Sequence, residues 1–330
     1  MVKKIFMMVF GGILLNVFAT IGFSEEIKKI ETKTFNLTFG GYISVQGDEG
    51  FITVNSWDKP EVKLVMTKRA WGKSKEDAEK NLEKLEIKIE QYENRLDIKL
   101  IKPKENQNFS FWDIFDPDTW QDNRHSPTAD FELTVPKQSN LKLINDEGEV
   151  TVRSIKGDIE IHVDEGDIQL SDLEFNEMNL SVDEGGVEGT NLMNPDGRLT
   201  ITVDEGDISL EDVSVRRLRV ECDEGNVVVK NLEANSCSIA ADEGDIELTL
   251  SLHENDHYRL KSDEGNITCY LPQRSDVRLD LETEDGGITS DFDVQIRREG
   301  DGRICRDKLG SGAALIEAAT DEGTIAIREQ

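Results

Sequence analysis

A triplet of Asp, Glu and Gly recurs along most of this chain, and its spacing constrains the fold more than any other feature. The triplet "DEG" begins at Asp146, Asp164, Asp183, Asp204, Asp223, Asp242 and Asp263, in steps of 18 to 21 residues. Further copies begin at Asp48 and Asp321, and a degenerate copy, "EDGGI", begins at Glu284. Repetition near 20 residues at constant phase is typical of architectures whose units stack on one another.

Apolar residues keep a fixed position relative to each triplet. They stand five and three residues before the Asp and four after it, as Leu199, Ile201 and Ile208 do around Asp204. Within each unit they alternate with polar residues, so the period is two and the units consist of strands. One such unit buries a single face and needs stacked neighbours. We therefore predict an all-β fold, with a right-handed parallel β-solenoid of ~20-residue coils over 141–330.

The triplet has a partial explanation as a turn. Gly supplies positive φ without steric cost, and the Asp side chain can bond amides of the turn, but Glu has no such role. Stacking at about 4.8 Å would place the acids in rows of like charge, which repel by about 0.8 kcal/mol per pair even in water. Two explanations stay open, namely solubility combined with turn chemistry, or cation binding.

Calcium is the only candidate cofactor, because it takes six to eight oxygen ligands and suits carboxylates from adjacent strands. The pattern matches neither an EF-hand loop nor the nonapeptide calcium repeat. The candidate ligands are the acids of the five central corners: Asp164, Glu165, Asp183, Glu184, Asp204, Glu205, Asp223, Glu224, Asp242 and Glu243.

Charge and the N-terminus bear on location and partners. A net charge of −30 disfavours nucleic acid and anionic lipid, and it favours cations or basic partners. Residues 1–24 begin with "MVKK", continue with an apolar stretch and end in "GFS", which predicts a cleaved secretory signal, with an uncleaved anchor as the alternative. No second stretch of spanning length follows, so we expect an extracytoplasmic protein, periplasmic, secreted or at the cell surface.

The four cysteines, Cys222, Cys237, Cys269 and Cys305, match neither a CxxC redox pair nor a zinc site. Three of them fall at apolar positions of the repeat. We expect buried free thiols, and any disulfide would involve Cys305.

The segment 25–140 precedes the repeats and is predicted to be β-rich. Ser74, with Asp77 three residues on, predicts a short helix over 74–86, followed by two strands about a turn at Asn94. A loop over 105–128 is rich in aromatic and acidic residues. Its side chains Phe111, Trp112 and Trp120 could form a platform for a sugar or peptide, or they could cover the open end of the solenoid.

The remaining clusters of polar residues are explained better by structural roles than by a chemical function. "HENDH" at 253–257 offers two imidazoles but is expected to be a solvated insertion. Arg217 and Arg219 are expected to pair with neighbouring acids. His162 is expected at an outward strand position. No nucleophile elbow, phosphate loop or Ser/His/Asp set occurs, so we expect no catalytic residues and no enzyme; the enzymatic rival is a polysaccharide-cleaving β-helix.

Several segments together resemble the bacterial putative-adhesin family, also called toast-rack domains. These are "FGGYISVQGDEGFITVNSWDKPEVKL", "KEDAEKNLEKLEIKIE", coils of the form "VDEGDI" and the ending "GSGAALIEAATDEGTIAI". The resemblance covers nearly all of the chain after residue 24. It implies extracytoplasmic β-solenoid domains of unknown function, surface or envelope-associated binding, in some members envelope-stress sensing, and no catalytic residues to carry over.

Family members often carry Ser-Ser-Gly at the corner, so the Asp-Glu-Gly ladder sets this chain apart. We expect a non-enzymatic, adhesin-like binding or structural protein whose partner is a surface ligand, polysaccharide or basic protein. The alternatives are a calcium-dependent β-helix protein that binds or cleaves polysaccharide, and an envelope-stress sensor domain.

Overall fold

The computed structural model describes residues 25–101 and 126–330. The predicted signal segment 1–24 lies outside the described residues. So does most of the aromatic loop, including Phe111, Trp112 and Trp120, and both interpretations of that loop stay predictions.

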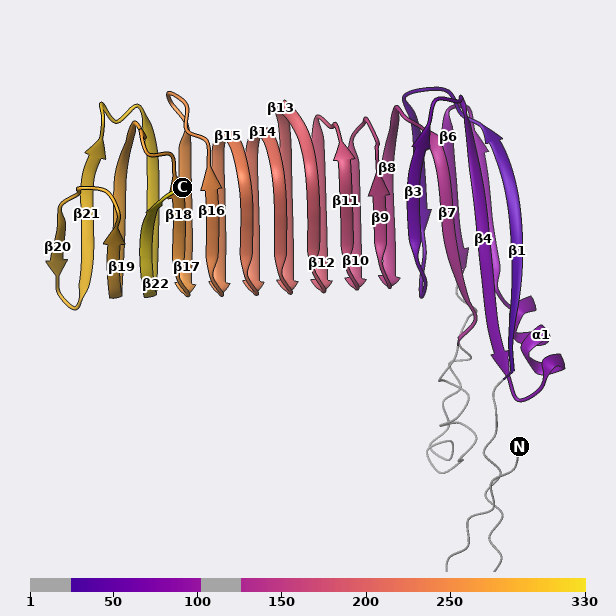
Figure 1. Cartoon of the computed structure of the whole chain (residues 1–330). Helices are drawn as coiled ribbons and strands as arrows, with labels where there is room; N and C mark the ends of the chain where they lie inside the picture. The colour runs from indigo at the N-terminus through magenta and orange to yellow at the C-terminus, as the bar shows by residue number, and fades with distance from the viewer. Residues whose placement is uncertain (1–24, 102–125) are drawn as a thin grey trace, which may run out of the picture.

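The N-terminal part contains seven strands and the one helix of the described residues (Figure 1). Its elements are β1 (Glu25–Asn36), β2 (Gly41–Gln46), β3 (Ile52–Trp57), β4 (Glu61–Gly72), α1 (Lys75–Glu83), β5 (Glu86–Tyr92), β6 (Arg95–Ile101) and β7 (Thr128–Pro136). The Ser74 side chain caps α1 by accepting from the Asp77 amide, as predicted. The two strands around Asn94 are also confirmed, since β5 and β6 pair in antiparallel fashion.

The remaining strands follow one another along the repeats. They are β8 (Ser139–Glu147), β9 (Val150–Arg153), β10 (Ile159–Glu165), β11 (Ile168–Leu173), β12 (Glu177–Glu184), β13 (Val187–Glu205), β14 (Ile208–Glu224), β15 (Val227–Glu243), β16 (Ile246–Leu250), β17 (His257–Glu264), β18 (Ile267–Leu271), β19 (Val277–Ser290), β20 (Ile296–Glu299), β21 (Gly302–Leu309) and β22 (Ala314–Glu329). Figure 1 shows most of them as a long row of parallel coils, with the hairpin of β20 and β21 at its far end.

Successive coils pair in parallel and hold the register that the triplet phase predicts. Leu199 of β13 lies opposite Leu218 of β14, which lies opposite Cys237 of β15. Ile168, Ile208 and Ile246 share a second column, in which Val187 and Val227 alternate with them. Each of these side chains is almost fully buried. The chain is therefore a parallel β-solenoid with an aliphatic core.

Each coil has three inward-facing runs separated by three corners. In the coil of β14 the inward residues are Ile208, Leu210, Val213, Val215, Leu218, Val220 and Cys222. The first corner is the DEG triplet. The second is a left-handed residue, Asp212 with φ 55°, and its equivalents are Asp172, Asn191 and Asn231. Asp and Asn are the non-glycine residues that tolerate this conformation best, which explains the second corner.

The stacking order departs from chain order at both ends of the solenoid. The coil of β2 and β3 stacks directly on β8 and β9, although more than 80 residues of chain separate them. At the other end, β22 lies between β17 and β19, so the last segment of the chain is inserted before the coil of Glu284. The hairpin of β20 and β21 then covers the edge of β19 in antiparallel pairing.

Beyond β2 and β3 the strand pairing continues toward the N-terminal end of the molecule. The first added strand on each side is parallel to β2 or β3, and the strands after it pair in antiparallel fashion. One side extends through β6 to β5, and the other side extends through β7 and β4 to β1. The helix α1 contacts β4 and β1 at that end of the molecule (Figure 1). The outermost strand β1 is mostly exposed and carries three acids and three lysines, which discourages edge-to-edge pairing.

Candidate functional site: the corners of the solenoid

The triplets stack into one continuous acidic ladder. Parallel register places one acid of each corner directly beside the equivalent acid of the next coil. In spatial order the row is Glu49, Glu147, Glu165, Glu184, Glu205, Glu224, Glu243, Glu264, Glu322 and Asp285. The row therefore runs unbroken through both places where stacking departs from chain order.

Glycine at the corner is required by backbone contact as well as by conformation. Gly206 has φ 148° and donates its N–H to the Glu224 carbonyl at 2.8 Å. A β-carbon on Gly206 would lie 2.1 Å from the Gly185 carbonyl oxygen in the neighbouring coil. The same contact would be 2.0 to 2.6 Å at Gly166, Gly185, Gly225, Gly244 and Gly265. No side chain can be accommodated at such distances, so the glycine column is structural.

The turn bonds predicted for the triplet Asp are made by a different residue. At the five central corners of the described chain, no Asp of the triplet bonds a backbone amide: four of these Asp residues are exposed, and Asp164 pairs with His162. Instead the side chain after the glycine accepts from the next coil: Asp207 Oδ1 from the Asn226 N–H at 2.8 Å, and Asp245 Oδ1 from the Asn266 N–H at 2.8 Å. Asn226 in turn accepts from the Asp245 N–H at 3.1 Å. The prediction for Asp was wrong, and this polar ladder was missed.

A second missed feature lies just inside the corner. The residue before the triplet faces the core, and in four corners it is a small polar or sulfur side chain that bonds glycine carbonyls. Asn145 Nδ2 donates to the carbonyls of Gly50, Glu147 and Gly148, for example, and Ser262 Oγ donates to that of Gly244. These bonds satisfy inward carbonyls that would otherwise cost about 1–3 kcal/mol each. The available signal was the occurrence of Asn145, Cys222, Ser262 and Thr320 in a column that otherwise holds mostly Val and Ala.

The ten candidate calcium ligands lie in two neighbouring rows, of Asp and of Glu. Nine are exposed, and Asp164 is half-buried beside His162, whose Nε2 lies 3.0 Å from Asp164 Oδ1. Among residues 25–101 and 126–330, no group of three or more His, Cys, Asp or Glu side chains is arranged to hold a metal ion. Specific calcium binding by the ladder stays a prediction.

The third corner differs from the other two because its length and composition vary. We call it the variable corner and define it by register as residues 158, 176–177, 195–198, 216–217, 235–236 and 253–257. The expectation of a solvated insertion at "HENDH" holds for His253, Glu254 and Asn255, which are exposed, but not for Asp256. Asp256 is only 2% exposed and accepts from the His253 N–H at 2.7 Å, and Leu315 donates to its backbone carbonyl. The insertion is therefore anchored to the neighbouring coil through Asp256.

Arg217 at the variable corner and Arg219 on the strand after it do not both form ion pairs. Arg219 pairs with Glu221, as predicted. In the part of the chain that the structure describes, Arg217 forms no ion pair, because its register neighbours are Arg198 and Ser236. That half of the prediction was wrong. His162 occupies an outward strand position, as expected.

The four cysteines are buried and free. Burial raises the pKa of the Cys222 thiol to about 11 and that of Cys269 to about 12, and it raises the pKa values of Cys237 and Cys305 as well. Thiols held protonated in this way are poor nucleophiles and metal ligands. They act as small core residues of the repeat.

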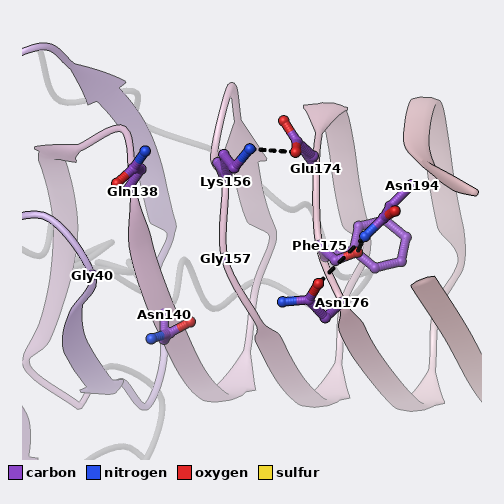
Figure 2. A pocket seen from close by; sticks show the side chains of 9 residues that line it. All are labelled: Gly40, Gln138, Asn140, Lys156, Gly157, Glu174, Phe175, Asn176 and Asn194. Carbon is purple, nitrogen blue, oxygen red and sulfur yellow. Dashed lines mark hydrogen bonds and ion pairs between the residues drawn. The ribbon is translucent and has the colours of Figure 1, made fainter. Parts of the chain in front are cut away.

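A shallow groove of about 260 Å³ lies beside the variable corner of the first coils (Figure 2). It is lined by Gly40, Gln138, Asn140, Lys156, Gly157, Glu174, Phe175, Asn176 and Asn194. Sequence inspection did not find it, because its residues come from five different coils and form no motif.

Fold and corners together define an acidic, parallel β-solenoid built on a glycine corner. The chain belongs to the Toastrack DUF4097 family, whose model matches residues 52–328. This confirms the resemblance drawn from the sequence. No curated protein matches the chain. None of the described residues forms a helix long and apolar enough to cross a membrane.

Solved structures similar to this chain share little sequence with it. A "putative adhesin" from Bacteroides fragilis NCTC 9343 is 13% identical, with 91% of this chain and 97% of that chain covered and a TM-score of 0.45. A "putative lipid binding protein" from Parabacteroides distasonis ATCC 8503 is 12% identical, with 90% and 96% covered and a TM-score of 0.39.

Proposed function

We propose that this chain is an extracytoplasmic, non-enzymatic, adhesin-like binding protein whose acidic ladder recognises cationic partners. The observation that carries the proposal is the continuous row of ten acids, one per coil, from Glu49 to Asp285. Stacked strands repeat at about 4.8 Å, so the backbone holds these charges in a regular line. A basic protein segment or a cationic polymer has the complementary repeat of charge.

The ladder is not explained by the needs of the fold alone. Glycine is required for backbone contact, and the polar residue after it makes the bonds between coils. Glu makes neither contribution at the central corners, yet it recurs there at a cost in repulsion. Family membership supports a binding role at the surface or in the envelope, and the predicted signal segment supports export.

The test compares two variants of equal net charge. One replaces three ladder acids with Gln (Glu184, Glu205 and Glu224), and the other replaces three exposed acids away from the ladder (Glu188, Glu211 and Glu233). Binding of residues 25–330 to polylysine is measured by calorimetry at several salt concentrations. We expect the ladder variant to bind more weakly than the control and to show a smaller salt dependence.

Equal losses in the two variants would mean that net charge alone attracts polylysine, and the ladder proposal would be abandoned. The non-enzymatic part has its own test. Turnover of a polysaccharide by the purified protein, abolished by one or two point substitutions, would overturn it.

A further inference from the structure

The groove beside the variable corner combines an open floor with side chains from neighbouring coils. Gln138 and Asn140 come from one coil, Lys156 and Gly157 from the next, and Glu174 to Asn176 from the third (Figure 2). The backbones of Gln138, Lys156 and Glu174 are bridged in parallel, so these positions are fixed relative to one another. A ligand would therefore meet a preorganised surface, which lowers the entropic cost of binding.

Two glycines keep the groove open. A β-carbon on Gly40 would have no atom within 4 Å, so the space beside it is empty. Gly157 has φ 154°, and a β-carbon there would lie 2.2 Å from the Ser139 carbonyl oxygen. No side chain can therefore fill the floor between the coils of Asn140 and Asn176. This hollow is a property of the backbone.

Some side-chain amides of the groove form hydrogen bonds within the protein, and others have donors or acceptors without a partner in the described part of the protein. Asn194 is fully used, because its Nδ2 donates to the Phe175 carbonyl at 2.7 Å and its Oδ1 accepts from the Asp196 N–H at 3.1 Å. Asn140 Oδ1 accepts from the Asp158 N–H at 2.9 Å, which leaves Asn140 Nδ2 unused. Among the described residues, the Asn176 Nδ2 and the whole Gln138 side-chain amide also have no partner.

Charge in the groove is balanced. Lys156 and Glu174 form an ion pair between adjacent coils at its rim (Figure 2). Glu174 Oε2 remains open as an acceptor at this rim, on the same side of the groove as Gln138, while Asn140 and Asn176 lie on the opposite side (Figure 2). The groove thus offers donors and acceptors without a net charge, in a protein whose net charge of −30 repels anions and whose ladder attracts cations elsewhere.

We propose that this groove binds a single neutral sugar residue of a glycan. Hydroxyl groups both donate and accept, so they match amide donors that stand beside carboxylate and amide acceptors. The volume of about 260 Å³ lies just below the usual range of small-molecule sites, which begins at about 300 Å³, and it suits one sugar ring rather than a chain. Because the groove is open and lacks an exposed aromatic ring, one site binds in the millimolar range.

This site is independent of the acidic ladder, since it lies at a different corner and takes an uncharged ligand. The test labels Asn and Gln side chains with ¹⁵N in residues 25–330 and follows their NH₂ signals by NMR. Neutral trisaccharides of hexose and N-acetylhexosamine are titrated to tens of millimolar. We expect the signals of Gln138, Asn140 and Asn176 to shift together and to saturate.

Matched variants assign the binding to the groove. Asn176→Ala and Gln138→Ala should each weaken binding about three- to ten-fold, the loss expected for one hydrogen bond, while Gln169→Ala on another face should leave it unchanged. Thermal unfolding checks that each variant is folded.

The proposal is overturned if none of the three groove signals shifts with any trisaccharide, or if the Gln169 signal shifts equally. It is also overturned if only anionic saccharides produce the shifts, because the neutral ligand class would then be wrong. The ladder variant Glu184, Glu205 and Glu224→Gln should bind the sugar normally, so failure of the ladder proposal leaves this result intact.

Discussion

The acidic corner and the variable corner belong to the same coils but follow opposite rules. The acidic corner has one length and nearly one sequence in every coil. The variable corner ranges from one residue at 158 to four at 195–198 and five at 253–257, and it contains amides, arginines and the docked "HENDH" segment. In the 21-residue coil that starts at Asp183, both additional residues fall at the variable corner. Changes in coil length are therefore tolerated there and not at the triplet.

Backbone contact explains this difference. At the acidic corner each glycine lies against the glycine carbonyl of the next coil, and a single residue more or less would break that column. At the variable corner and just before it, the coils are joined by residues such as Asp256 and Asn194, which adapt to different lengths. A corner that tolerates changes in length and sequence is a place where a family can vary its ligands. The residues of an unvarying corner are constrained mainly by the stability of the fold.

Both corners depend on the same buried core, so we expect the largest loss of stability from a substitution within that core. Ile208→Asp should abolish cooperative folding of the stack, because Ile208 is fully buried between Val187 and Val227 and an unpaired charge there costs several kcal/mol. Ser209→Asp, on the exposed side of the same strand, is the control. Thermal unfolding followed by circular dichroism measures both. A folded Ile208→Asp protein with an ordinary transition would contradict the stacked core.

The contrast between the corners predicts the next effect. Gly206→Val should cost about 3–5 kcal/mol, from the strained φ of 148° together with the 2.1 Å contact. Gly206→Ala should cost nearly as much, since the β-carbon alone causes both problems. Asp196→Val at the variable corner should change the free energy of unfolding by less than about 0.5 kcal/mol. Urea denaturation separates these outcomes, and similar losses at the two corners would remove the distinction.

The repeating parts of the structure could be predicted from the sequence. The apolar columns around Asp204 specify parallel register because a slip of one residue would turn the core residues outward. Ser74 and Asp77 specify the helix start through a local bond. Features of this kind can be predicted because they depend on residues that are close together in the sequence.

The non-repeating parts could not be predicted in the same way. Nothing in the phase of "DEG" at Asp321 says that β22 is inserted between β17 and β19, because every coil presents the same register to any neighbour. The bonding role of Asp207 depends on the N–H of Asn226 in the next coil. The groove likewise depends on residues from five coils. Each of these features arises from stacking, which a single repeat does not encode.

The next prediction concerns the effect of divalent cations on the acidic ladder. We expect calcium and magnesium to raise the melting temperature by equal, small amounts, because both would screen the row of acids without a fixed coordination site. Asp204→Asn should reduce both shifts slightly. A rise with calcium at micromolar to low millimolar concentration, much smaller with magnesium and blunted by Asp204→Asn or Glu205→Gln, would establish specific calcium sites instead.

The smallest effect concerns one acid of the ladder. Glu205 lies between Glu184 and Glu224, so Glu205→Gln removes two repulsions. The figure of about 0.8 kcal/mol per pair applies at the backbone spacing, and exposed Glu side chains can spread farther apart in solvent, so we expect a stabilisation of roughly 0.5 kcal/mol at low salt. The control is Glu211→Gln, because Glu211 is exposed on the same coil but lies between Thr190 and Lys230 and should lose a weak attraction. Both differences should shrink toward zero in about 1 M salt, where the screening length is about 3 Å. Urea midpoints at low and high salt measure the change.

If Glu205→Gln destabilises the protein in the absence of divalent ions, Glu makes a structural contact at the corner, and the view of the ladder as an acidic surface carried by a glycine turn would be wrong.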